Sequence, residues 1–203
     1  MPRSVGGSAK KSDDDEREVT MRRLMVLALA MVLAAPALMA GELAGVTMPD
    51  QVTVAGKTLE LNGMGLRKKL WIKVYVGGLY LPKKTHSAEE ALNMPGPKQL
   101  VMHFMTKKAT KKRMDAAWDE GFEKNAPKTS KVKIEKFKAM MGDMHPDDVV
   151  TLTFVPGEGT HVAVNGKEMG VIEGDDFGKA VFSIYLGPEP PTEDLKDGLL
   201  GKE

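Results

Sequence analysis

The amino-acid sequence predicts an α+β fold, in which a large and mostly antiparallel sheet carries a layer of helices on one face. Hairpin signals outnumber strand–helix–strand units from residue 51 onward, and strands that are joined by short turns pair antiparallel. Helical periodicity is confined to a few segments that separate runs of strands. The chain of 203 residues has no cysteine, so disulfides and thiolate metal sites are excluded, and the hydrophobic core alone must stabilise the fold.

The first 40 residues have the pattern of an export signal. Residues 1–20 are polar and charged, and this composition predicts disorder. Because signal peptides normally stand at the N-terminus, we expect translation to begin at Met21 and residues 1–20 to be a start-site artefact. Residues 21–40 combine a basic start with a wholly apolar run of about a dozen residues and small residues that fit a cleavage site. That run is shorter than the roughly 20 residues needed to span a bilayer. We therefore expect a signal peptide over 21–40, a periplasmic or secreted protein, and no stable membrane span after cleavage.

Residues 41–203 are expected to form a single domain, whose strands and helices can be placed in order. Strands are expected at 51–54, 58–61, 70–81, 100–106, 149–155, 160–164 and 169–172, with a type I′ turn signal at Asn165-Gly166 before the last one. Helices are expected at 87–94, 111–124 and from 175 or 176 to 186, while 132–140 is compatible with either state. Residues 189–203 form a Pro-rich and charged tail with at most one short helical turn.

The longest expected strand, 70–81, is predicted to lie at the centre of the sheet. An Asn62-Gly63 turn signal precedes it, and Gly77-Gly78 interrupts it, which indicates a bulge or the close approach of a ligand or another backbone. The clearest helix, 111–124, has one apolar stripe that should pack on the sheet: Met114, Ala117, Trp118, Gly121 and Phe122.

Composition and motifs exclude several classes of function. A formal net charge of +1 gives no field that would gather nucleic acid, and the sequence has no glycine-rich nucleotide-binding motif, nucleophile elbow or zinc-protease motif. The four histidines lack partners at metal-binding spacing, so neither a metal nor a cofactor is expected. A basic cluster over 107–113 is interpreted as a solvated strand-to-helix connection in preference to an anionic-lipid patch.

The motif Gly-Met-Gly-Leu-Arg at 63–67, followed by the strand segment 73–81, resembles the signature of the chalcone isomerase family, and most closely its exported bacterial chalcone isomerase-like branch. Weaker matches occur at 117–118, 156–160, 165–166 and 185–187, so the resemblance covers essentially the whole expected domain. It implies an open-faced β-sandwich, in which a large antiparallel sheet and a helical layer enclose an apolar cleft. This implication agrees with the α+β fold that the residue patterns predict.

The same resemblance implies a role for Arg67. In the enzymes of the family, an arginine at this place orients the substrate oxygen and stabilises the developing negative charge. Their other polar groups have no counterpart here: Tyr75 stands where they have a threonine, and Met114 and Gly121 stand where their helix has a tyrosine and an asparagine. Loss of such donors typically costs about 2.7–4 kcal/mol each in a site that excludes water. An efficient chalcone isomerase is therefore not expected.

Three functions remain open at this point. The favoured hypothesis is a non-catalytic, exported binder of a fatty acid or another hydrophobic carboxylate, with Arg67 on the carboxylate, Tyr75 as a second donor, and Met114 and Trp118 lining the cleft. The alternative is an intramolecular lyase, an isomerase of the chalcone isomerase type, that acts on an enone-like substrate with Arg67 stabilising the oxyanion. The third is a partner-binding or structural module in which Arg67 only braces a turn.

Overall fold

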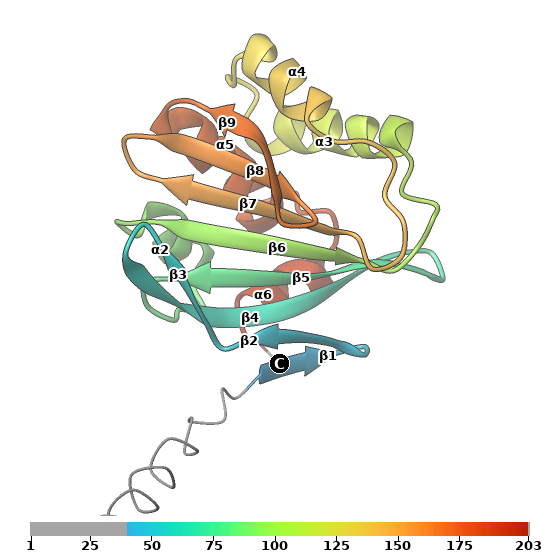
Figure 1. Ribbon diagram of the computed structural model, residues 1–203, viewed down its shortest axis with the longest axis horizontal. Coiled ribbons are helices and arrows are strands. Elements are labelled where there is room, and N and C mark those ends of the chain that lie inside the picture. Colours follow the sequence, from blue (N-terminus) through green and yellow to red (C-terminus); the bar gives the residue numbers. More distant parts are fainter. Residues whose placement is uncertain (1–39, 203) are drawn as a thin grey trace, which may run out of the picture. The chain divides into compact units, whose positions relative to one another are not determined.

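The computed structural model describes residues 40–202, which are built around one seven-stranded sheet (Figure 1). The strands follow one another in sequence order across the sheet, and every neighbouring pair is antiparallel. They are β3 (Gln51–Val54), β4 (Lys57–Lys69), β5 (Ile72–Leu81), β6 (Lys98–Phe104), β7 (Val149–Val155), β8 (Gly159–Val164) and β9 (Lys167–Ile172). This meander confirms the predicted large antiparallel sheet.

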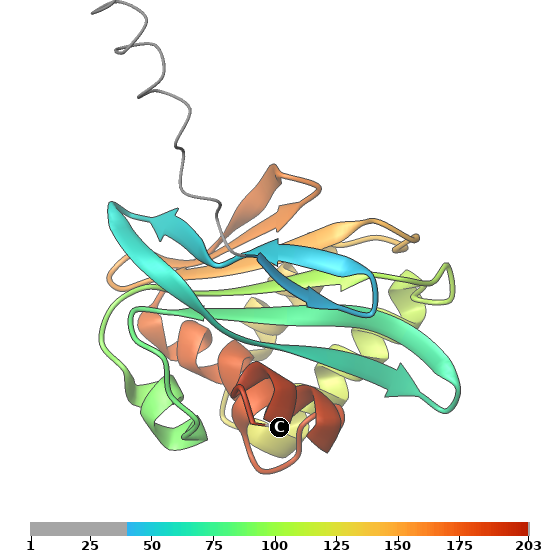
Figure 2. The ribbon, with the colours of Figure 1, turned by 90° about the horizontal axis from the view of Figure 1, so that it is seen from below.

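Helices gather on one face of the sheet, and a separate two-stranded hairpin lies on the other (Figure 2). The helices are α2 (Ala88–Asn93), α3 (Lys111–Asn125), α4 (Lys131–Ala139), α5 (Asp175–Leu186) and α6 (Glu193–Leu199), and the hairpin pairs β1 (Ala40–Leu43) with β2 (Val46–Pro49). At the start of α2 the Ser87 hydroxyl accepts a hydrogen bond from the Glu90 amide N–H at 3.2 Å, as its capping box predicts. The ambiguous segment 132–140 is helical in α4. The β1–β2 hairpin was not predicted.

Each face of the sheet has its own buried core. The larger core lies between the sheet and the helices and includes Tyr75 and Leu79 of β5. The alternate residues of β5, Val76 and Tyr80, belong to a smaller core together with Met48 of β2. All of these core residues lie inside one compact unit, Leu38–Glu203. The unit therefore contains the hydrophobic surfaces that it needs to fold by itself.

The long β4–β5 hairpin corrects the predicted position of a turn. β4 continues through Asn62-Gly63, where the pairing only shifts register, and the turn lies instead at Leu70-Trp71. Leu70 adopts a left-handed backbone conformation with φ of 56°, and Leu70 and Trp71 are 78% and 83% exposed. The apolar composition of these two residues led to the prediction of a strand, whereas they form the exposed tip of the hairpin.

The C-terminal tail also differs from the prediction, because it contains a buried helix. Leu195, Leu199 and Leu200 of the α6 region are fully buried. The two glycines of the β4 motif allow this packing: a Cβ atom on Gly63 would lie 2.2 Å from the Gly198 carbonyl oxygen, and one on Gly65 would lie 2.3 Å from the Leu195 carbonyl oxygen. The backbones of β4 and α6 are thus in direct contact.

The interrupting glycine pair of β5 is explained in the same way, by close approach of other groups. A Cβ atom on Gly77 would lie 3.2 Å from a methyl group of Leu195, and one on Gly78 would lie 2.3 Å from the Met48 sulfur. The pair therefore lets α6 and β2 approach opposite faces of β5.

The predicted start region, 1–20, and all of the predicted signal peptide, 21–40, except its last residue lie outside the described residues. Within the described part of the chain, none of the helices combines the length and the apolar character that a bilayer-spanning segment requires.

Candidate functional site

The register of the β4–β5 hairpin places Arg67 and Tyr75 side by side. The two residues are directly paired in the ladder, so their side chains leave the sheet on the same face. That face is the helical one, because Tyr75 belongs to the larger core. The guanidinium carbon of Arg67 lies 5.6 Å from the centre of the Tyr75 ring, which is within the range of a cation–π interaction.

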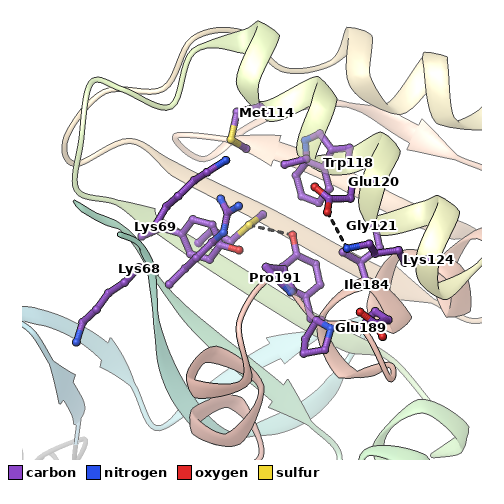
Figure 3. A pocket seen from close by; sticks show the side chains of 16 residues that line it. Lys68, Lys69, Met114, Trp118, Glu120, Gly121, Lys124, Ile184, Glu189 and Pro191 are labelled. Atoms are coloured by element: carbon purple, nitrogen blue, oxygen red, sulfur yellow. Dashed lines mark hydrogen bonds and ion pairs between the residues drawn. The ribbon is translucent and has the colours of Figure 1, made fainter. Parts of the chain in front are cut away.

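Helices α3 and α5 supply the opposite wall of a cavity of about 280 Å³ (Figure 3). Met114, Trp118 and Gly121 are one helical turn apart on α3, and their side of the helix faces Arg67 and Tyr75 across the cavity. Gly121 brings α3 close to α5, because a Cβ atom there would lie 2.6 Å from a methyl group of Ile184. The remaining wall includes Met102 of β6, Tyr185 of α5 and the prolines of the C-terminal segment, Pro190 and Pro191.

A second cavity, of about 360 Å³, adjoins the first and reaches the hairpin tip. Arg67, Met114 and Glu120 line both cavities. The second one extends outward past Ile72 to Leu70 at the exposed turn. Arg67 therefore stands where the inner and outer cavities meet.

Two buried N–H donors of the inner cavity have no hydrogen-bond partner within the described residues. They are Arg67 Nε and Trp118 Nε1. Nor does any carboxylate among residues 40–202 form an ion pair with Arg67. A buried donor without a partner costs about 1–3 kcal/mol. Both donors are thus available to an acceptor that enters the cavity, and binding it would recover this energy.

The two tyrosines of the inner cavity are neutral hydroxyl donors at physiological pH. Burial raises the pKa of Tyr75, although the nearby Arg67 charge opposes this shift. Burial, followed by the neighbouring Tyr75 hydroxyl, raises the pKa of Tyr185 well above its ordinary value. The Tyr185 hydroxyl contacts the Met102 sulfur at 3.2 Å, drawn as a dashed line in Figure 3. Neither phenol is suited to act as a general base.

Basic side chains surround the mouth of the inner cavity. Lys68 and Lys69 follow Arg67 on β4, and Figure 3 shows Lys69 extending toward Met114. On the α3 side, Lys124 forms an ion pair with Glu120 at 2.8 Å, and this contact lowers the pKa of Glu120. Glu120 is therefore already paired, and the remaining charged residues of the cavity, Arg67, Lys68 and Lys69 against Glu189, carry a net positive charge that attracts anions.

The structure brings together all four site residues that the sequence predicts, since Arg67, Tyr75, Met114 and Trp118 line one cavity. Their role in binding stays a prediction. Sequence reasoning missed Tyr185, which lies within the last predicted helix, and the two prolines of the tail. Within the described residues, no group of three or more histidine, aspartate or glutamate side chains is arranged to hold a metal ion.

The comparisons with known proteins agree with this geometry. The family model described as chalcone isomerase-like matches residues 40–201. The chain belongs to the chalcone isomerase-like family. The family match of this chalcone isomerase-like protein starts at β1 and ends just after α6, so it includes the unpredicted β1–β2 hairpin and the helix of the C-terminal tail.

A solved structure has the same fold as this chalcone isomerase-like protein. The crystal structure of a fatty-acid-binding protein from Arabidopsis thaliana aligns with a TM-score of 0.65 and 16% sequence identity, over 80% of this chain and 96% of that chain. At this identity the likeness shows the fold alone. No curated protein matches the chain.

Proposed function

We propose that this chalcone isomerase-like protein binds a fatty acid or another hydrophobic carboxylate, with Arg67 as the anchor. The observation that carries the proposal concerns Arg67 Nε, which is buried at the junction of two cavities and has no hydrogen-bond partner among residues 40–202. The Arabidopsis protein with the same fold is a fatty-acid-binding protein, which supports this choice of ligand.

The residues around Arg67 suit a carboxylate with an apolar tail. A guanidinium forms two parallel hydrogen bonds to a carboxylate, and the Trp118 indole N–H and the Tyr75 hydroxyl line the same cavity as further donors. The tail would contact Met102, Met114 and Ile184. The two adjoining cavities, of about 280 and 360 Å³, are at the lower end of the range of ligand sites, roughly 300–1,000 Å³.

The proposal includes export of the protein before it binds its ligand. The basic, apolar and small-residue segments of 21–40 support a cleaved signal peptide. N-terminal sequencing of the protein recovered from the periplasm or medium tests this part. A protein that retains residues 21–35 would contradict it.

Native mass spectrometry and a fatty-acid binding assay on residues 38–203 test the ligand. We expect a bound acyl species, and we expect Arg67→Ala to weaken binding by about 30-fold or more, because truncation of one partner of a buried charged hydrogen bond costs about 2–5 kcal/mol. Lys84→Ala is the control, since Lys84 is an exposed cation that lines neither cavity. Equal affinities of both variants, with circular dichroism spectra unchanged, would refute the assignment of Arg67.

A second candidate is an intramolecular lyase that acts on an enone-like substrate. It is favoured by the arrangement of Arg67 with the neutral hydroxyls of Tyr75 and Tyr185, which together would stabilise an oxyanion. The wall opposite Arg67 has fewer hydrogen-bond donors for an oxyanion, because Met114 and Gly121 provide no side-chain hydroxyl or amide there. Turnover of a cyclisable chalcone, with a larger loss in kcat than in affinity for Arg67→Ala, would establish this function in place of the binder.

A further inference from the structure

The hairpin tip, Leu70-Trp71, is the only adjacent pair of exposed large hydrophobic residues in the described chain. Leu70 is 78% exposed and Trp71 is 83% exposed. The left-handed backbone of Leu70 places both at the outer end of the long β4–β5 hairpin. Exposing them to water is unfavourable, and nothing in the fold requires apolar residues at a two-residue turn, where glycine, asparagine and aspartate are preferred.

A group of basic residues surrounds this tip. The connection from β6 to α3 lies at the same end of the sheet (Figure 1), and Leu70 of the tip lines one cavity together with residues of this connection. We call these side chains the basic collar; they are Lys68, Lys69, Lys73, Lys107, Lys108, Lys112 and Arg113. All seven residues are exposed, and none forms an ion pair with a carboxylate among residues 40–202.

Acidic residues at this end of the sheet do not neutralise the basic collar. Glu120 is paired with Lys124, and Asp115 is paired with Lys111, which is outside the collar.

The acidic residues of the loop before β7 are hydrogen-bonded within the fold. The Asp143 carboxylate accepts a hydrogen bond from the Lys111 amide. The Asp148 carboxylate accepts hydrogen bonds from the His145 amide and the Asn165 side chain. Asp147 lies 3.2 Å from His103. The three loop carboxylates keep their charge, but the seven cations of the collar outnumber them and form no ion pair with a carboxylate among residues 40–202, so a net positive charge is available to an external anionic surface.

We propose that the hairpin tip docks the protein on a lipid bilayer that contains anionic lipids, with Leu70 and Trp71 inserted into the interfacial region and the basic collar on the headgroup phosphates. Tryptophan favours the boundary between headgroups and acyl chains, and a few inserted apolar side chains act together with lysines to bind such a surface. The collar includes part of the cluster at 107–113 that sequence alone suggested was only a solvated connection.

The docked orientation would turn the outer cavity toward the bilayer. Leu70 of the tip, together with Lys108 and Arg113 of the collar, lines the outer cavity, which meets the inner cavity at Arg67. A hydrophobic ligand would thus have a route from the acyl region to Arg67 without crossing water. The docking can be tested separately from the proposed binding of fatty acid, because vesicle binding is measured without fatty acid.

Vesicle sedimentation of residues 38–203 tests the docking, with phosphatidylcholine vesicles that either contain or lack phosphatidylglycerol. We expect binding only to the anionic vesicles, with a loss at high salt. Leu70→Asn/Trp71→Ser should lower the partition coefficient by about tenfold or more. Asparagine is chosen because it tolerates the left-handed conformation of residue 70. Val132→Ser is the control, since Val132 is 79% exposed on α4, away from the tip.

The basic collar is tested with Lys73→Gln/Lys107→Gln/Lys112→Gln, which avoids the residues that line the cavities. Each lysine near an anionic surface contributes about fivefold, so the partition coefficient should fall by about a hundredfold. The control, Lys57→Gln/Lys83→Gln/Lys84→Gln, removes the same charge from exposed residues at the opposite end of β4 and β5.

Tryptophan fluorescence reports the insertion directly. The chain has two tryptophans, and Trp118 is already buried, so a blue shift on vesicle addition would come from Trp71. Trp71→Phe should keep vesicle binding and lose the shift. Equal binding to neutral and anionic vesicles, or equal losses in the tip and control variants, would overturn the proposal. Binding of fatty acid by a protein that ignores vesicles would overturn the docking alone.

Discussion

Replacing Gly65 by alanine should destabilise the whole domain, because the new methyl group has no space. The Cβ atom would lie 2.3 Å from the Leu195 carbonyl oxygen and 3.0 Å from its Cα atom. Both neighbours are backbone atoms, so a side-chain rotation cannot relieve the clash. Overpacking a tight interior costs about 1–3 kcal/mol when side chains can adjust. Here α6 itself must move away from β4.

The cost of displacing α6 can be estimated from the leucines that it buries. Leu195, Leu199 and Leu200 are fully buried, and each contributes about 1.5–3 kcal/mol to the free energy of unfolding. Even partial exposure of the three should therefore lower this free energy by about 3 kcal/mol or more. For a domain of this size, that change corresponds to a fall in Tm of roughly 6–12 °C.

Urea unfolding of Gly65→Ala, followed by circular dichroism, measures this effect. Gly142→Ala is the matched control, because a Cβ atom on Gly142 meets nothing within 4 Å and its φ is not left-handed. The control should change the free energy of unfolding by less than about 0.5 kcal/mol. A loss below about 1 kcal/mol in Gly65→Ala would refute the view that the glycines of the motif serve the packing of α6.

Two further predictions concern α3 and the loop before β7. Gly121→Ala should cost about 1–3 kcal/mol in urea unfolding, less than Gly65→Ala, because its clash at 2.6 Å is with a methyl group of the Ile184 side chain, which can shift. Asp148 accepts hydrogen bonds from Asn165 and the His145 amide, which lower its pKa below the ordinary value of 3.8. Its stabilising contribution is therefore present above pH 3.8 and is lost as the pH falls toward its lower folded-state pKa. Acid unfolding of Asp148→Asn should show a shallower loss of stability in this range, and an unchanged slope would count against the assignment.

Local periodicity was enough to predict the parts of the fold that local sequence determines. The stripe of α3 is an example: Met114, Trp118, Gly121 and Phe122 are buried as the helical spacing requires. The type I′ turn at Asn165-Gly166 also joins β8 to β9 as predicted, and both residues have positive φ. In these cases the preferred local conformation and the final fold agree.

The errors arise where distant segments determine the local structure. Asn62-Gly63 has the composition of a turn, but Gly63 is required for contact with α6, some 135 residues later (198 − 63). Leu70-Trp71 has the composition of a strand, yet it is the exposed hairpin tip. The charges and prolines of residues 189–203 predict an exposed tail, although its leucines are part of the larger core. For Gly63 and for the tail, no short window of sequence contains the partner that decides the structure, whereas at Leu70-Trp71 the local composition itself is misleading.

The candidate site was predicted in part for the same reason. Arg67 and Tyr75 were found through the family resemblance, and the ladder then placed them as direct partners. Tyr185 comes from α5, more than a hundred residues away in sequence, so only the packing of α5 against the sheet reveals it as a wall of the cavity. The helix predicted from 175 or 176 to 186 includes Tyr185, but the sequence gives no indication of which side chains Tyr185 contacts.

A substitution that keeps the bulk of Arg67 but removes its charge separates binding from bracing. Arg67→Met eliminates a buried Nε donor that has no partner in the described part of the chain, which removes a cost of about 1–3 kcal/mol. It also loses a cation–π contact with Tyr75 of about 0.5–1 kcal/mol. If Arg67 serves a ligand, the free energy of unfolding of the ligand-free variant should be unchanged or higher, while fatty-acid binding is lost. If Arg67 braces the hairpin, the free energy of unfolding should fall, and fatty-acid binding should weaken as a consequence. Urea unfolding of delipidated protein beside a binding titration decides between them. A loss of stability above about 1 kcal/mol would contradict the binding role, because residues that serve a ligand commonly lower the stability of the empty fold.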